Sequence, residues 1–213
     1  MSSAPSSPAE LARDLRGLLL EPAEAARFDV QGRIDSAVLV PLFLHEGALH
    51  AVFTRRGAHL RRHAGEISFP GGRRDPHDPD LVATALREAE EEIGLPADVV
   101  EVLGALAPTP TVVTNYRVYP FVGLIDPGRQ WRPAAREVDA VLELGLAALR
   151  DGARRERLVR RGIPFRTDVY VVDDQLIWGA TARIVADLLA RLGPLAPGTT
   201  KGGPQAALRL PQG

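Results

Sequence analysis

Hydrophobic positions recur with helical spacing in three segments of the chain. The first begins at Pro8 and ends near Leu20, the second ends at about Ile93, and the third covers Ala180–Leu192. Apolar side chains three and four residues apart fall on one face of a helix, so each segment is predicted to form an amphipathic helix. Proline is accepted at a helix start, and glycine favours a helix end, which makes Gly94 the expected C-terminal cap of the second helix.

Most of the remaining ordered sequence is predicted to form strands. Short runs of apolar and β-branched residues between Gly, Pro and Asp residues favour strands over helices. The predicted strands are Ser36–Leu44, Leu49–Thr54, Glu66–Phe69, Val99–Leu106, Val118–Leu124, Glu137–Leu142, and two that pair across RGIPFRTD, Arg157–Val159 and Val169–Val172. A turn at His45–Gly47 joins the first two strands into a hairpin, and a short helix is expected near Leu146–Arg150.

The order of these elements indicates the fold class. Strands come first, then one acidic helix, then more strands and a terminal helix, without the regular alternation of a doubly wound sheet. We therefore predict an α/β (α+β) protein with a mixed β-sheet sandwiched between helices. With 213 residues, of which 45% are hydrophobic, the chain is expected to form one domain over residues 8–193. Residues 1–7 and 194–213, rich in Ser, Pro and Gly, are predicted to be disordered.

Charge and composition exclude several classes of protein. The formal net charge of -1 argues against broad attraction to nucleic acid or membrane, so neither is an expected partner. The absence of cysteine excludes disulfides and a thiol nucleophile. The longest apolar stretch, Ala37–Leu44, is too short to span a bilayer, and the N-terminus lacks a basic start followed by an apolar segment. A cytoplasmic protein acting on a small molecule is expected, and a homodimer stays open.

The second helix carries a cluster of carboxylates. Helical spacing gathers Glu88, Glu91 and Glu92 opposite an apolar face that includes Ala89 and Ile93. Like charges four residues apart destabilise a helix by a few tenths of a kcal/mol, and the C-terminal half of a helix disfavours anions. A hard divalent cation such as Mg²⁺ would reverse both penalties. The alternative is a solvated acidic face.

The same helix and the glycines before it resemble the Nudix box, written G-x5-E-x7-R-E-U-x-E-E-x-G-U with U aliphatic. Its second half matches completely over REAEEEIGL, from Arg87 to Leu95. Its first half departs from the pattern, because Asp78 stands where the box has Glu and Arg87 follows nine residues later instead of eight. The role of Asp78 is left open.

Two further segments resemble the coenzyme A diphosphatase branch of this family. The first is VFTRRGAHLRRHAGEISFPGG, which ends at Gly72, and the second is IWGATARI, Ile177 to Ile184. The branch also carries a DxxDxxxxxTALREAxEE pattern, which this chain matches with the extra residue in its box. The resemblance implies the Nudix fold and hydrolysis of the diphosphate of CoA or acyl-CoA to 3',5'-ADP and (acyl)phosphopantetheine.

The resemblance also implies roles for particular residues, with Mg²⁺ or Mn²⁺ as cofactor. The expected metal ligands are Glu88, Glu91 and Glu92, the expected catalytic residues are Glu91, Glu92 and Arg87, and the expected substrate-binding residues are Arg56, His63, Gly71 and Gly72. Arg87 is expected to hold the helix in place more than to touch substrate, because its guanidinium suits a carboxylate or a loop carbonyl.

Some alternatives stay open on the sequence alone. A general base is expected from outside the box, and nothing in the sequence selects between Glu137 and Glu143, while His63 is a further candidate. The substrate alternatives are other nucleoside diphosphate derivatives, including nucleotide sugars and dinucleotides, or a damaged nucleoside triphosphate. A binding module for CoA or a nucleotide, without turnover, is the alternative from a different class.

Overall fold

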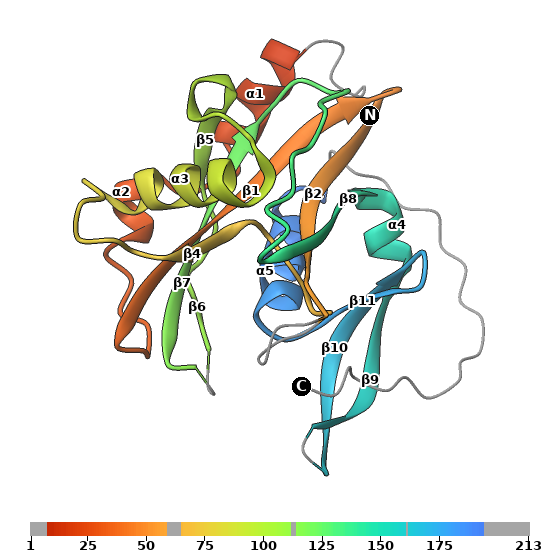
Figure 1. Ribbon diagram of the computed structural model, residues 1–213. Helices are drawn as coiled ribbons and strands as arrows, with labels where there is room; N and C mark the ends of the chain where they lie inside the picture. Colours follow the sequence, from red (N-terminus) through yellow and green to blue (C-terminus); the bar gives the residue numbers. More distant parts are fainter. Residues whose placement is uncertain (1–7, 59–64, 112–113, 161, 194–213) are drawn as a thin grey trace.

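The computed structural model describes residues 8–58, 65–111, 114–160 and 162–193 (Figure 1). The terminal segments predicted to be disordered, 1–7 and 194–213, lie outside the described residues, as does His63. The division of the chain into one domain over 8–193 with disordered ends therefore stays a prediction.

The main sheet is mixed, as the sequence predicts. Its central order is β3-β2-β1-β7-β5, with β4 also pairing β1, β6 pairing β7 and β8 pairing β2. β1 runs parallel to β7, and the other pairings are antiparallel. The strands are β1 Ile34–His45, β2 Ala48–Arg56, β3 Ile67–Ser68, β4 Gly71–Arg73, β5 Glu101–Ala105, β6 Thr109–Pro110, β7 Tyr116–Leu124 and β8 Val138–Gly145.

Helices cover both faces of this sheet because its central strand is apolar on both sides. Alternate side chains of a strand point to opposite faces. Leu39 and Phe43 of β1 pack with helix α3, whereas Val40 and Leu42 pack with α1, α4 and α5. The sandwich of a sheet between helices is therefore confirmed. The helices are α1 Pro8–Arg16, α2 Pro22–Ala25, α3 Leu81–Ile93, α4 Leu146–Asp151 and α5 Gly179–Arg191, with a 3-10 turn η1 at Ala97–Val99.

A smaller second sheet follows α4 and has the order β11-β10-β9. β9 Ala153–Arg160 and β10 Ile163–Val172 form a hairpin that projects beside the main sheet, and β11 is Gln175–Ile177 (Figure 1). The predicted pairing of Arg157–Val159 with Val169–Val172 is wrong in register, because Ile163 already lies opposite Arg160. Most of the intervening segment is itself strand. Its charged residues alternate along an exposed face and hide the strand signal in the sequence.

Three other expectations need correction. α1 ends at Arg16 instead of Leu20, because Leu20 leaves the helix and exchanges two backbone hydrogen bonds with Ala105. The predicted Gly71–Gly72 turn is the start of strand β4, which pairs with Ala37 and Val38. The strand expected from Val99 begins only at Glu101, after η1. The first two differences come from long-range pairing that local residue preferences do not encode. The third comes from the local 3-10 turn η1, which delays the start of the strand.

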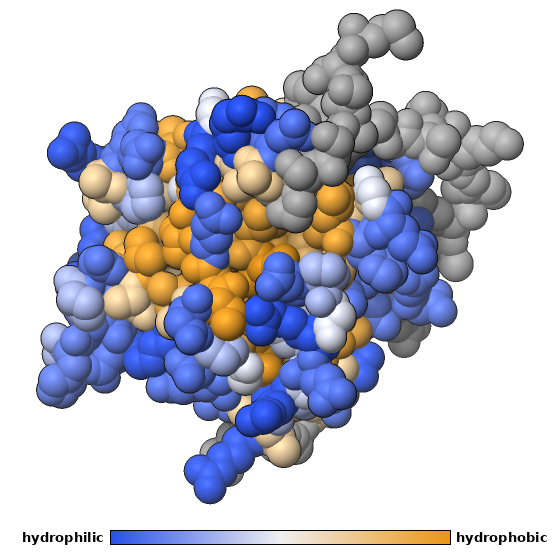
Figure 2. All heavy atoms as spheres, turned by 90° about the horizontal axis from the view of Figure 1, so that it is seen from above, coloured by the Kyte–Doolittle hydropathy of each residue, from blue (hydrophilic) through white to orange (hydrophobic). Residues whose placement is uncertain are grey.

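The surface is largely hydrophilic on the face seen in Figure 2, with an apolar area at its middle. Among the described residues, the exposed large hydrophobic side chains are Phe28, Val159 and Ile163, and the last two belong to the β9–β10 hairpin. Within the described ranges, none of the helices combines the length and the hydrophobicity needed to span a membrane.

Candidate active site

Helix α3 is fixed at both ends by its own sequence. The Asp80 carboxylate accepts a hydrogen bond of 2.8 Å from the Ala83 backbone N–H, which makes Asp80, and not Asp78, the N-terminal cap. Gly94 takes the left-handed conformation, with φ 68°, that ends the helix at Ile93. The predicted end of this helix near Ile93, with Gly94 as its C-terminal cap, is confirmed.

One face of α3 packs on the sheet and turns the acidic face outward. Ala85, Ala89 and Ile93 are buried against β1 and β7, in the core cluster that contains Leu39 and Phe121. Val82 and Leu86, which the sequence places on the same face, are partly buried at the edge of this cluster. The small alanines bring the helix axis close to the sheet. The carboxylates of the helix then lie over strand β4.

Two glycines allow α3 and β4 to approach one another. The Gly71 N–H donates to Glu92 Oε2 at 3.2 Å, and Gly71 itself has φ 156° and leaves no room for a side chain against Val38 of β1. A Cβ on Gly72 would lie 2.5 Å from the carboxyl atoms of Glu88. The Gly-Gly pair is therefore needed for its lack of side chains, since each residue touches either the central strand or a carboxylate.

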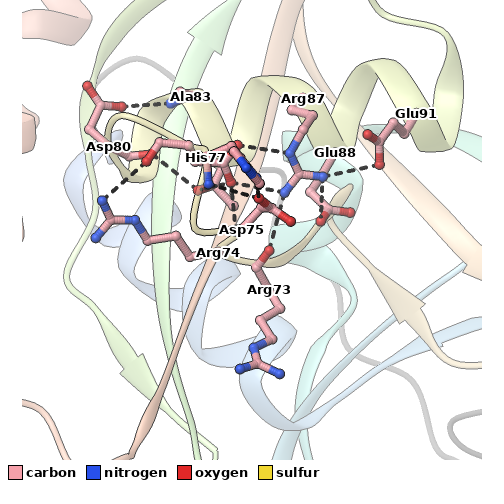
Figure 3. Close-up of polar contacts among 11 residues, drawn as sticks. Arg73, Arg74, Asp75, His77, Asp80, Ala83, Arg87, Glu88 and Glu91 are labelled. Atoms are coloured by element: carbon pink, nitrogen blue, oxygen red, sulfur yellow. Dashed lines mark hydrogen bonds and ion pairs between the residues drawn. The ribbon is translucent and has the colours of Figure 1, made fainter.

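Arg87 clamps the loop before the helix to the helix itself (Figure 3). Its Nε donates to Asp78 Oδ1 and its Nη2 donates to Asp78 Oδ2, each at 3.0 Å, in a two-pronged ion pair. Asp78 Oδ2 also accepts from the Thr84 hydroxyl at 2.8 Å and from the Asp75 backbone N–H at 2.9 Å. The hydrogen bonds from Arg87 are the main reason that the pKa of Asp78 lies far below its usual range.

These contacts assign Asp78 a position that the sequence left open. Its side chain is buried, with 7% of its surface exposed, and its carboxylate is enclosed by donors. It faces Arg87 and the helix start. In this chain, the residue that replaces the Glu of the box closes the loop onto helix α3.

Arg87 also reaches the acidic face of the helix. Its Nη1 donates to Glu88 Oε1 at 3.0 Å and to Glu91 Oε2 at 3.1 Å, and its Nη2 donates to the Arg73 carbonyl at 3.3 Å (Figure 3). The guanidinium thus joins three carboxylates and one strand of the sheet. This geometry agrees with the positioning role expected for Arg87, and its catalytic role stays a prediction.

Glu88 and Glu92 form an electrostatically strained pair. Burial is the main cause that raises the pKa of both carboxyls, and the pKa of Glu92 reaches about 7. The Gly71 N–H and the charge of Arg56 lower the pKa of Glu92, whereas Glu88 and Glu137 raise it. A buried and a partly buried carboxylate that repel one another favour either a proton or a cation between them.

The donor set fits a hard divalent cation. Mg²⁺ and Mn²⁺ prefer oxygen ligands such as carboxylates. Here the carboxylates lie on one face of α3, and the glycines of β4 approach them closely. In the described part of the chain, no group of three or more His, Asp and Glu side chains is gathered closely enough to hold a metal ion. Glu91 is 61% exposed and turned to Arg87, so Glu92, which is buried, and Glu88, which is partly buried, are the less exposed acids of the predicted set. The place of Glu91 among the ligands stays a prediction.

A pocket of about 700 Å³ reaches Gly71, the residue whose N–H donates to Glu92. Gly71 and Arg56 belong to its lining, and the lining continues onto β10 and the first turn of α5. The Nε of Arg56 is buried and has no hydrogen-bond partner among the described residues. The guanidinium of an arginine that lines a pocket suits an anionic group of a ligand. The substrate-binding role of Arg56 stays a prediction.

The two candidate bases outside the helix lie in different surroundings. The charge of Glu137 raises the pKa of both Glu88 and Glu92, so Glu137 lies in the electrostatic field of the pair. Glu143 instead accepts a hydrogen bond of 2.7 Å from Trp131 Nε1. Glu90, the remaining acid of the helix, is exposed, as its position in the helix predicts.

Sequence reasoning missed the wall of the pocket that the second sheet supplies. Phe165 and Thr167 of β10 lie on it, and Trp178, the residue before α5, lies beside them. The charged residues of β10 hide this surface in the sequence. The signal that points to it is IWGATARI, because its residues from Trp178 to Thr181 line the pocket.

The chain is similar to known Nudix proteins. The family model described as "NUDIX domain" matches residues 33–161. A protein named "Uncharacterized Nudix hydrolase NudL" from Salmonella newport (strain SL254) is 40% identical over 161 residues, which cover 75% of this chain and 83% of the relative. The protein of the same name from Salmonella enteritidis PT4 (strain P125109) matches to the same extent.

Solved structures share the fold. A Nudix hydrolase from M. smegmatis, RenU, has a TM-score of 0.54 at 16% identity, covering 82% of this chain and 100% of that chain. A MutT/nudix family protein from Enterococcus faecalis has a TM-score of 0.53 at 14% identity, covering 89% of this chain and 70% of that chain. At these identities the likeness concerns the fold alone.

The Asp78–Arg87 pair should stabilise the fold measurably. Asp78→Asn keeps the shape of the side chain but removes its charge, and we expect the free energy of unfolding at pH 7 to fall by about 2 kcal/mol. Because the pKa of Asp78 is lowered from 3.8, its stabilisation is complete above about pH 4 and is lost as the pH falls below that value. The free energies of unfolding of the variant and the parent, measured with urea, should therefore differ less in acid than at pH 7.

Asp75→Asn is the matched control for this measurement. Asp75 lies in the same loop, but its side chain is half exposed and contacts only His77 among the described residues. It should leave the free energy of unfolding nearly unchanged. Equal losses of the free energy of unfolding in the two variants would contradict the stabilising role of the Asp78–Arg87 pair. A loss in Asp78→Asn that does not depend on pH would contradict it too.

The buried Glu92 should make the protein less stable at higher pH when no divalent cation is present. Its pKa is raised from 4.5 to about 7, so the folded state holds the proton more tightly, and stability falls as the pH rises through this interval. In the presence of a chelator, Glu92→Gln should remove this decline, which is at most about 3 kcal/mol in the free energy of unfolding. Glu90→Gln, on the exposed side of the same helix, should keep the decline.

Thermal or urea unfolding between pH 4 and pH 8 checks this expectation. Added Mg²⁺ should restore the stability of the parent at pH 8 and should have little effect on Glu92→Gln, because a bound cation favours the ionised carboxylate. An unchanged pH dependence in Glu92→Gln would show that another group causes it.

Proposed function

The chain belongs to the Nudix family, and from that premise we propose that it hydrolyses the diphosphate of coenzyme A or acyl-CoA in a metal-dependent reaction. As a Nudix hydrolase, it acts on a diphosphate, that is, on an acid anhydride bond. The proposed products are 3',5'-ADP and (acyl)phosphopantetheine. The proposed cofactor is Mg²⁺ or Mn²⁺, and the proposed location is the cytoplasm.

One observation carries the choice of CoA. The two segments that resemble the coenzyme A diphosphatase branch are more than a hundred residues apart in sequence, yet both line the same pocket. Arg56, Phe69 and Gly71 come from the first segment, and Trp178 and Thr181 come from the second. Their convergence on one pocket, whose Gly71 donates to Glu92, supports one substrate that contacts both segments.

The residues of the site have complementary tasks in the proposed reaction. Hydrolysis forms a bond from a water oxygen to phosphorus and breaks the bond from that phosphorus to the bridging oxygen, so negative charge builds on the phosphate oxygens. Arg56, which lines the pocket, is proposed to contact these oxygens through its guanidinium. Glu88 and Glu92 would hold the cation, which when bound neutralises charge and lowers the pKa of water.

Glu137 is the better candidate for the base that takes the proton from the attacking water. It is exposed, and its charge acts on both Glu88 and Glu92. Glu143 is engaged by the Trp131 indole. The proposed role of Arg87 is to keep Glu88 and Glu91 in place while it stays paired to Asp78, which requires no contact with substrate.

Turnover of CoA should depend on Glu92 and on a divalent cation. Glu92→Gln removes a charge from the buried pair and should lose nearly all activity with CoA and Mg²⁺ while remaining folded, whereas Glu90→Gln should keep near-normal turnover. Product analysis in oxygen-18 water by mass spectrometry identifies both products and the phosphorus that is attacked.

Near-normal turnover by Glu92→Gln would contradict this assignment of the site. If CoA is not cleaved but a nucleotide sugar, a dinucleotide or a damaged triphosphate is cleaved rapidly, the proposed chemistry stands and the proposed substrate is wrong. Tight binding of CoA without cleavage at any metal concentration would instead indicate a binding module.

A further inference from the structure

The loop between β7 and β8, residues 125–137, covers the C-terminal end of helix α3. The Arg132 N–H donates to the Ile93 carbonyl at 3.0 Å. The Ala134 N–H donates to the Glu92 carbonyl at 2.9 Å. The last carbonyls of a helix have no partner within the helix, so these bonds satisfy groups that would otherwise need water. The end of α3 that carries Glu92 is therefore tied to this loop.

The same loop ends at Glu137, and a single residue connects Glu137 to Glu92. The Ala134 carbonyl accepts a hydrogen bond of 2.8 Å from the Glu137 N–H. The Glu137 carbonyl accepts one of 2.9 Å from Gly57, the residue after Arg56 of the pocket lining. Ala134 thus bonds to Glu92 through its N–H and to Glu137 through its carbonyl. These successive bonds fix the backbone of the proposed base relative to that of the buried acid.

The first part of the loop has fewer backbone bonds. The structure describes all of residues 125–137 and shows neither a helix nor a strand there. Among the described residues, the backbone hydrogen bonds of the loop lie at Ile125 and from Arg132 onward. A segment with few hydrogen bonds opens at a low cost in free energy. The position of the loop therefore depends on contacts of its side chains.

Trp131 supplies such a contact three residues before Ala134. Its indole Nε1 donates to Glu143 Oε1 of β8 at 2.7 Å. Its ring packs against the core cluster under α3, which contains Ala89 and Ile93. The indole has a single N–H, so the bond to Glu143 fixes the direction in which the ring points. Trp131 thereby joins the loop to both the helix and strand β8.

The contact defines what Glu143 has to provide. The N–H of an indole is a neutral donor and needs an acceptor oxygen, which an amide supplies as well as a carboxylate does. A general base must instead take up a proton, which an amide does not do in this role. The task of Glu143 can therefore be told apart from that of a base by one conservative substitution.

We infer that Trp131 and Glu143 are positioning residues, whose bond holds the loop 125–137 on the end of α3 and keeps Glu137 beside Glu92 during the reaction. This inference rests on the proposed function, in which Glu137 takes the proton from water, and it adds two residues to that function. Glu143, which the sequence leaves as an alternative base, then serves as the acceptor that anchors the loop.

Substitutions at Glu143 test the inference in the reaction with CoA and Mg²⁺. Glu143→Gln keeps an acceptor oxygen, whereas Glu143→Met has a similar length and lacks that oxygen, so we expect kcat close to that of the parent only in Glu143→Gln. Glu143→Met and Trp131→Phe should each lower kcat by about tenfold, part of the roughly 100-fold or more that a general base contributes. KM should change little, because the lost interaction acts in the transition state.

A double variant shows whether the loss acts through Glu137. Glu137→Gln removes the proposed base, so adding Trp131→Phe to it should lower kcat no further. A loss that came only from weaker folding would instead lower kcat by the same factor with and without Glu137. Circular dichroism and urea unfolding establish the folded fraction of each variant under the conditions of the assay.

The anchor is also measurable without metal or turnover. The chain has two tryptophans, so a Trp178→Phe protein reports on Trp131 alone. In the presence of a chelator, adding Glu143→Met to this protein should increase the quenching of Trp131 fluorescence by acrylamide, because the loop opens more often. Adding Glu143→Gln should leave the quenching as it is.

The outcomes separate this inference from the function on which it rests. Equal losses of kcat or equal quenching in Glu143→Gln and Glu143→Met, near-normal kcat in Trp131→Phe or Glu137→Gln, or a further loss in the double variant would overturn the inference and leave the hydrolysis of CoA standing. If the folded parent cleaves another diphosphate but no CoA derivative, the proposed substrate is wrong, and the same variants compared on that diphosphate decide the inference. A folded parent that cleaves no diphosphate with Mg²⁺ or Mn²⁺ would remove both.

Discussion

The close approach of helix α3 to strand β4 is the constraint on which the site depends. It requires small residues on both sides: Ala85 and Ala89 on the helix face toward the sheet, and Gly71 and Gly72 on the strand. Any side chain at Gly71 would collide with β1, which pairs with β4 and β7 and lies at the centre of the sheet. The burial of Glu92 is a consequence of this packing, because its carboxylate lies against the Gly71 N–H.

That packing sets an electrostatic problem that the protein solves only in part. Arg87 compensates Asp78 fully, through two hydrogen bonds, and shares its remaining donors between Glu88 and Glu91. Arg56 acts on Glu92 from the pocket side. Burial raises the pKa of Glu88 and of Glu92 by more than these donors and charges lower it. A cation bound at the two carboxylates would favour their ionised forms and so supply the compensation that these partners do not.

Much of this arrangement could be predicted from the sequence because its causes are local. Gly94 ends α3 through its own backbone conformation, and the apolar spacing of the helix selects its buried face. The role of Asp78 could not be predicted in this way, since Asp78 and Asp80 both precede the helix and only tertiary contacts show that one caps it while the other pairs with Arg87. Glu91 illustrates the same limit, because helical spacing places it with Glu88 but leaves the direction of its side chain to Arg87.

The parts of the molecule that serve the reaction and the substrate come from different stretches of the chain. The family match covers residues 33–161 and includes every acid of the proposed cation site. The part of the pocket lining from Ile163 to Arg183 lies after it. Family membership therefore bears on the proposed chemistry at Glu88 and Glu92 but says little about this part of the lining, since a fold does not determine the substrate. Because β9–β11 form a separate sheet, residues there can change the substrate that is accepted without disturbing the packing of α3 on β4.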